Sequence, residues 1–101
     1  MRVRRLPQFV SDVADAVIYL GDLNSMAATK LRSKVSAAVA HLRRFPRSGS
    51  LRHELGEDIR RWPVQGFDYA IYYRAQSDAL VLLRLLHGRR NTDAGWFKEE
   101  E

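Results

Sequence analysis

Two stretches of helical periodicity follow a short first strand. Residues 2–6 alternate polar and apolar positions, which predicts a strand, and Pro7 then stands where a proline favours the start of a helix. Gly21, Asp22 and Asn24 end this first helix, and Ser25 is the predicted N-cap of a second helix that stops before Pro46. The apolar stripes of the two helices are Phe9, Val13, Ala16, Val17 and Leu20, then Ala28, Leu31, Val35, Ala38, Val39 and Leu42.

The second half of the chain has the pattern of strands. Residues 59–64 and 68–74 are rich in strand formers, and Gln65-Gly66 forms a turn between them. Pro63 indicates a sheet edge or a bulge. A short loop leads to residues 79–87, whose near-continuous apolar run predicts a central strand covered on both faces. A buried helix is the alternative there, but the tyrosine-rich strand and short loop before it favour a hairpin.

The order of elements is therefore β-α-α-β-β-β. It predicts an α+β domain in which a helical hairpin packs on one small antiparallel sheet. A chain of 101 residues has room for one core, so we expect a single domain over residues 1–93 and a frayed C-terminal tail over residues 94–101.

Composition excludes several classes of protein. The chain has no cysteine, which excludes disulfides and thiolate metal sites. Its three histidines have no metal-ligand spacing, so neither a metal nor a cofactor is expected. No segment has the pattern of a signal peptide or a membrane span, and we predict a cytoplasmic protein.

The basic residues are the most distinctive chemical feature. The net charge is +5, and nearly all the cations are arginines, which suit bidentate contacts to carboxylates and phosphates. This composition points to an acidic protein partner or to nucleic acid, with solubility as the simpler alternative. Strand alternation places Arg84 on the face of Leu82 and Leu86, with His87 on the other face. For Arg84 two interpretations are open, a structural ion pair and a place in the site.

Other candidates for chemistry are few. His87 has the right titration range for a general acid or base, although a structural role at the strand end is the simpler interpretation because no companion carboxylate is near it in sequence. The strand aromatics favour core packing over base stacking; they are Trp62, Tyr69, Tyr72 and Tyr73. The chain has no phosphate-binding glycine loop, nucleophile elbow or zinc-protease motif, so its motifs alone do not indicate an enzyme.

Several short segments, taken in order, resemble the ParE/RelE toxin superfamily. The segments are Leu42-x-x-Phe45-Pro46 at a helix end, Arg61-Trp62-Pro63-Val64, Gly66-Phe67-Asp68-Tyr69-x-Ile71-Tyr72-Tyr73-Arg74, and Leu86-His87-Gly88-Arg89-Arg90-Asn91. The resemblance covers residues 2–93 and implies the toxin of a type II toxin–antitoxin system. ParE-like members poison DNA gyrase, RelE-like members cut mRNA on the ribosome, and both are neutralised by an antitoxin in a hetero-oligomer.

The two branches imply different roles for the same residues. Arg60, Arg61 and Arg89 match basic positions of the nuclease branch, and His87 lies near a histidine of some nucleases. Asp68, however, stands where that branch has an arginine, and the C-terminal segment offers Trp96 and Phe97 in place of a tyrosine. The resemblance is therefore closer to the ParE branch.

The leading hypothesis is a toxin that binds and poisons DNA gyrase without covalent chemistry. Its target-binding residues are predicted to be Arg60, Arg61, His87, Arg89 and Arg90. A ParD-like or RelB-like antitoxin, partly acidic and partly apolar, is expected to cover the helical hairpin and a sheet edge. The alternative is a ribosome-dependent endoribonuclease using His87, Arg89 and Arg61, and a third hypothesis is a module that only binds its partner.

Overall fold

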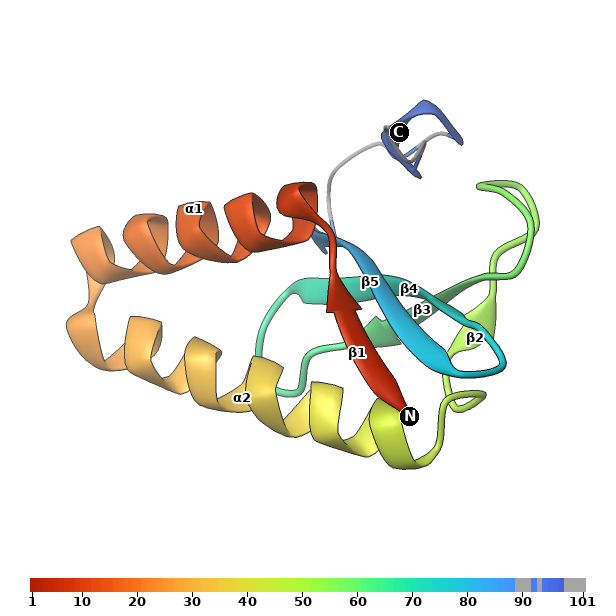
Figure 1. Cartoon of the computed structure of the whole chain (residues 1–101). Helices are drawn as coiled ribbons and strands as arrows, with labels where there is room; N and C mark the ends of the chain where they lie inside the picture. Colours follow the sequence, from red (N-terminus) through yellow and green to blue (C-terminus); the bar gives the residue numbers. More distant parts are fainter. Residues whose placement is uncertain (89–91, 93, 98–101) are drawn as a thin grey trace.

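A pair of helices covers one face of a five-stranded sheet (Figure 1). The computed structural model describes residues 1–88, 92 and 94–97. The elements are β1 (Arg2–Arg5), α1 (Pro7–Leu23), α2 (Ser25–Arg44), β2 (Ser50–Leu51), β3 (Ile59–Pro63), β4 (Tyr69–Ala75), β5 (Ala79–His87) and the 3-10 helix η1 (Ala94–Phe97). The α+β class and the predicted order of the main elements are confirmed. No helix in these described ranges is long and apolar enough to cross a membrane.

The sheet is mixed, with the order β1-β5-β4-β3-β2. Strands β3, β4 and β5 form the predicted antiparallel meander, but β1 pairs with β5 in parallel. The prediction of an entirely antiparallel sheet was wrong at β1. The two helices carry the chain from β1 to β2 at the opposite edge of the sheet, and the antiparallel strands that follow return β5 beside β1 in the same direction. A second difference is the two-residue strand β2, which lies in the predicted loop after α2.

Asn24 connects the two helices. Its backbone N–H donates to the carbonyl oxygen of Leu20 at 2.7 Å and so ends α1. Its side-chain oxygen accepts from the backbone N–H groups of Met26 at 2.9 Å and Ala27 at 3.4 Å, and so begins α2. The N-cap is thus Asn24, and the prediction of Ser25 was one residue late because Asn24 had been assigned only to the end of the first helix.

The core has two halves, one on each face of the sheet. The inner half joins the predicted helix stripes to alternate residues of β4 and β5, among them Phe9, Leu31, Val35, Leu42, Ile71, Tyr73, Leu80, Leu82 and Leu85. The outer half includes Leu55, Tyr72, Val81, Leu83, Leu86 and Phe97. The prediction that β5 is covered on both faces is confirmed. The predicted frayed tail was wrong for residues 94–97, because Phe97 is buried on this outer face; residues 98–101 lie outside the described part of the chain.

A β-bulge interrupts the pairing of β4 with β5. Tyr72 lies opposite Arg84, whereas the next residue, Tyr73, lies opposite Leu82. The extra residue, Leu83, reverses the alternation, so that Leu82 faces the helices and Leu86 faces outward. The prediction that Leu82 and Leu86 share a face was therefore wrong, and Arg84 lies on the outer side with its cross-strand neighbour Tyr72.

Tyr73 fixes the loop that follows α2. Its hydroxyl donates to the carbonyl oxygen of Pro46 at 2.8 Å and accepts from the backbone N–H of Gly49 at 2.8 Å. Burial of the ring raises the pKa of the Tyr73 hydroxyl. Gly49 has no room for a side chain, since a Cβ there would lie 2.6 Å from the Tyr73 hydroxyl oxygen.

Candidate functional site

The structure separates Arg60 and Arg61, although they are neighbours in β3. Arg60 lies opposite Tyr73 and its guanidinium donates to the carbonyl oxygens of Gly49 at 2.8 Å and Arg47 at 3.2 Å. Arg61 lies opposite Tyr72 on the outer face, and its side chain makes no hydrogen bond or ion pair with the described residues. Arg60 therefore supports the loop after α2, while Arg61 is available to a ligand.

His87 lies at the end of β5, on the face that carries the helices. Its ring meets the ring of Tyr69 edge-on, with centroids 5.2 Å apart. Its Nε2 atom lies 3.6 Å from a carboxylate oxygen of Asp68, a partner that was missed from sequence. Tyr69 pairs with His87 across β4 and β5, and the Asp68 carbonyl accepts from the N–H of Gly88 at 2.8 Å. The hairpin thus supplies the companion carboxylate that the local sequence lacks.

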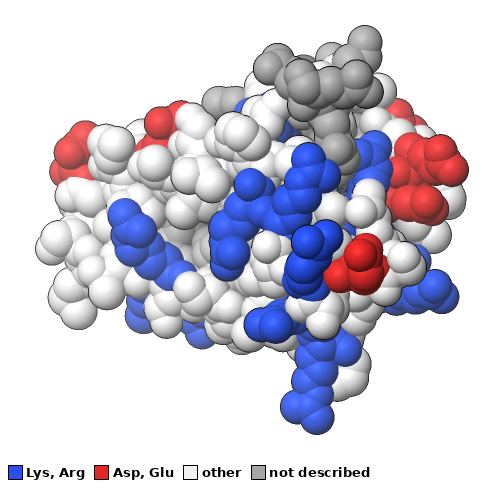
Figure 2. Space-filling view, in the orientation of Figure 1, with Lys and Arg blue, Asp and Glu red and all other residues white. Residues whose placement is uncertain are grey.

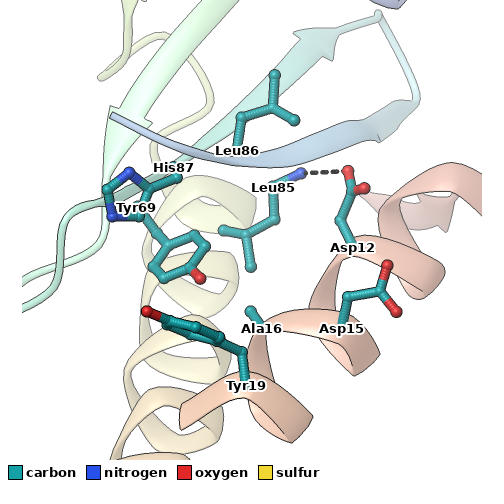
Figure 3. A pocket seen from close by; sticks show the side chains of 8 residues that line it. All are labelled: Asp12, Asp15, Ala16, Tyr19, Tyr69, Leu85, Leu86 and His87. Atoms are coloured by element: carbon teal, nitrogen blue, oxygen red, sulfur yellow. Dashed lines mark hydrogen bonds between the residues drawn. The ribbon is translucent and has the colours of Figure 1, made fainter. Parts of the chain in front are cut away.

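A groove runs from His87 along α1 (Figure 3). In Figure 3 the side chain of Tyr69 reaches the groove from the sheet, whereas those of Tyr19 and Asp15 reach it from α1. Its other lining residues are Asp12, Ala16, Leu85 and Leu86. The groove is acidic and aromatic, in contrast to the basic composition of the chain, and Asp15 and Tyr19 were not singled out from the sequence.

Arg84 forms a structural ion pair. Of the two interpretations left open by the sequence, a structural ion pair and a place in the site, the structure supports the first. Its guanidinium contacts the carboxylate of Asp12 at 2.7 and 2.9 Å, and the two side chains are 17% and 13% exposed. The Cζ atom of the same guanidinium lies 5.0 Å from the centre of the Trp96 ring. These contacts join α1, β5 and η1. The role of Asp12 was not predicted from the sequence, where Asp12 is one polar residue beside the apolar stripe of the first helix.

A separate basic surface surrounds the edge strand β1. Blue side chains gather over β1 and the adjoining end of α2 in Figure 2, whereas red ones lie mostly at the margins of the view. Arg2, Arg4 and Arg5 are exposed, and Arg43 donates to the carbonyl oxygen of Met1 at 2.9 Å. This surface suits a polyanionic or acidic partner, and it is distinct from the predicted site at the end of β5.

The predicted target-binding residues do not form one cluster in the described part of the chain. Arg61 and His87 lie on opposite faces of the sheet, Arg60 is bound to backbone carbonyls, and Arg89 and Arg90 lie outside the described residues. No group of three or more metal-ligating side chains occurs within the described ranges.

The described residues form a small α+β domain with two helices on one face of a five-stranded sheet and an arginine-rich surface around β1 (Figure 2). The family model described as "ParE toxin of type II toxin-antitoxin system, parDE" matches residues 3–92. The chain belongs to this ParE toxin family. A solved structure described as "Chromosomal ParDE TA system from P. aeruginosa" is similar to it, with a TM-score of 0.74 and 15% sequence identity over 86% of this chain and 95% of the other. No curated protein sequence matches the chain.

Proposed function

We propose that this ParE-family toxin acts by binding and poisoning DNA gyrase. The match to the ParE family over residues 3–92 carries the proposal. The separation of Arg61 from His87 argues against a nuclease centre that uses both residues, because a nuclease needs its proton-transfer group and its cation at the same phosphate. The proposed target-binding residues are Arg61, His87, Arg89 and Arg90, and Arg60 holds the loop after α2.

An assay with two purified targets separates binding to gyrase from RNA cleavage. The toxin is incubated with DNA gyrase and plasmid, and in parallel with ribosomes translating an mRNA. Accumulated gyrase–DNA breaks with intact mRNA are expected, and His87→Ala and Arg89→Ala should each reduce the breaks. Arg52→Ala is the matched control, since Arg52 is an arginine outside the proposed target-binding set and its side chain is paired with Glu54 at 2.9 Å. Specific mRNA cuts that disappear in the His87 and Arg89 variants would establish the nuclease instead.

A ParD-type antitoxin is the proposed partner of the helical hairpin. Large apolar side chains are exposed along α1 and at its junction with α2; they are Val10, Ile18, Tyr19, Leu23 and Met26, which range from 52% to 78% exposed. A partner that covers them removes this apolar area from water. Its acidic residues would be attracted to the arginines of β1 and α2, which speeds association at low salt.

Expression in cells tests the pairing. The toxin alone should arrest growth, and co-expression of the antitoxin should restore it. Unimpaired growth in the presence of soluble toxin would favour a module that binds its antitoxin without poisoning a target.

A further inference from the structure

Asp12 holds Arg84 in one orientation. Its Oδ1 accepts from Nη2 of Arg84 at 2.9 Å and its Oδ2 accepts from Nε at 2.7 Å, which is the parallel two-bond arrangement that fixes the plane of a guanidinium. Oδ2 also accepts from the backbone N–H of Leu85 at 3.0 Å. The carboxylate is thus fully engaged with β5, although it belongs to α1.

The open edge of β5 explains why a carboxylate is needed there. β1 pairs with residues 79–82 of β5, and from Leu83 onward no described strand lies on that side. Asp12 takes the place of the absent strand at Leu85. The bulge at Leu83 then brings Arg84 within reach of Asp12 from the outer face of the sheet.

The opposite side of the Arg84 guanidinium contacts η1. Nη1 donates to the carbonyl oxygen of Trp96 at 3.3 Å, and Cζ lies 5.0 Å from the centre of the Trp96 ring. The next residue, Phe97, is buried against Tyr72, with ring centroids 5.0 Å apart. Arg84 therefore gives η1 a polar attachment beside the apolar one that Phe97 supplies.

We infer that Asp12 is a positioning residue, which acts through Arg84 to hold η1 against the sheet. Without the carboxylate, the guanidinium of Arg84 regains its hydration by turning toward water, and it then leaves Trp96. Because η1 follows the segment proposed to contact gyrase, the functional part of this inference rests on the proposed function. The structural part concerns only α1, β5 and η1.

Fluorescence quenching of Trp96 tests the structural part. Trp62→Phe leaves Trp96 as the single tryptophan, and acrylamide quenching then reports its exposure. Asp12→Asn should increase quenching, since hydrogen bonds to charged groups are strong enough to change the undocked fraction by roughly tenfold or more. Asp15→Asn, about one turn along α1, is the matched control and should leave quenching unchanged, because the carboxylate that pairs with Arg84 is that of Asp12. Asp12→Glu, which keeps the charge, should restore part of the protection.

Equal quenching in the Asp12→Asn variant and its parent overturns the inference. If Asp12→Asn does not fold by circular dichroism, Arg84→Lys replaces it, because lysine keeps the charge but loses the two parallel hydrogen bonds. Increased quenching in a folded variant, absent from Asp15→Asn, supports the inference.

The gyrase assay tests the functional part. Asp12→Asn and Trp96→Ala, which removes the ring but not the ion pair, should both lose gyrase–DNA breaks. Full activity in both variants, with the parent active, refutes a role in positioning for the target. If the parent itself produces no breaks, the proposed function fails, while the quenching result still decides whether Asp12 positions η1.

Discussion

The Tyr73 hydroxyl offers a direct test of how the loop after α2 is held. Tyr73→Phe removes one oxygen and leaves two backbone groups without their partner, the N–H of Gly49 and the carbonyl of Pro46. A buried polar group left unsatisfied costs about 1–3 kcal/mol, and the Pro46 carbonyl costs less because its bond is only partly buried. We expect a loss of about 3 kcal/mol, which for a domain of this size lowers Tm by roughly 15 °C.

Urea unfolding followed by circular dichroism measures this loss. The midpoint should fall while the slope with denaturant stays constant, because the surface exposed on unfolding hardly changes. Tyr72→Phe is the matched control, since the adjacent hydroxyl has no hydrogen bond within the described part of the chain. A loss below about 0.5 kcal/mol for Tyr73→Phe, the size of an ordinary surface substitution, would refute the reasoning.

The raised pKa of the Tyr73 hydroxyl predicts that the folded chain loses stability at alkaline pH. Burial raises the pKa of the folded Tyr73 hydroxyl above the ordinary value of 10.0. The folded chain therefore holds its proton more tightly than the unfolded chain does, and this contribution is complete below pH 10.0. It is lost as the pH rises through the folded pKa. In Tyr73→Phe this component of the alkaline slope should be absent, and an unchanged slope would contradict the assignment.

Two smaller predictions concern the helix junction and an exposed loop. Asn24→Ala should lower the free energy of unfolding by about 1 kcal/mol through loss of the N-cap, whereas Ser25→Ala should leave it nearly unchanged; urea unfolding that gives the reverse order would restore Ser25 as the cap. The hydrogen bond from Arg52 lowers the pKa of Glu54, so Arg52→Ala should return that pKa toward 4.5 in an NMR titration with little change in stability. A pKa that does not move would mean that the pair is not formed in solution.

The sequence predicts those features of the fold in which apolar residues repeat with the period of a helix or a strand. The helix stripes that contain Leu31 and Leu42 form the inner core, and the apolar run of β5 is buried on both faces, because burial repeats with the geometry of each element. The parallel position of β1 was missed because no local pattern states which strand it will join. The bulge at Leu83 was missed for a related reason, since one extra residue leaves the composition of a strand unchanged.

The site was less predictable than the fold. Asp12 and Arg84 are distant in sequence, and Asp68 approaches His87 only when the hairpin forms. Arg60 and Arg61 have the same side chain, but Arg60 bonds to backbone carbonyls and Arg61 faces outward, because alternate positions of a strand face opposite sides of the sheet. The sequence shows which charged and polar side chains the chain has. The fold determines which of them bond to other parts of the same chain.

The parallel pairing of β1 with β5 has a consequence for the order of folding. The first strand and both helices are synthesised early, but β5, which lies beside β1 and contacts α1, is among the last segments to be made. Pairing between such distant segments is slow to form because a long loop must close first. A nascent chain that ends before Ala79 lacks β5, the strand that pairs with both β1 and β4 and contacts α1. The five-stranded sheet, and with it the proposed target-binding surface, therefore forms only after most of the polypeptide has been synthesised.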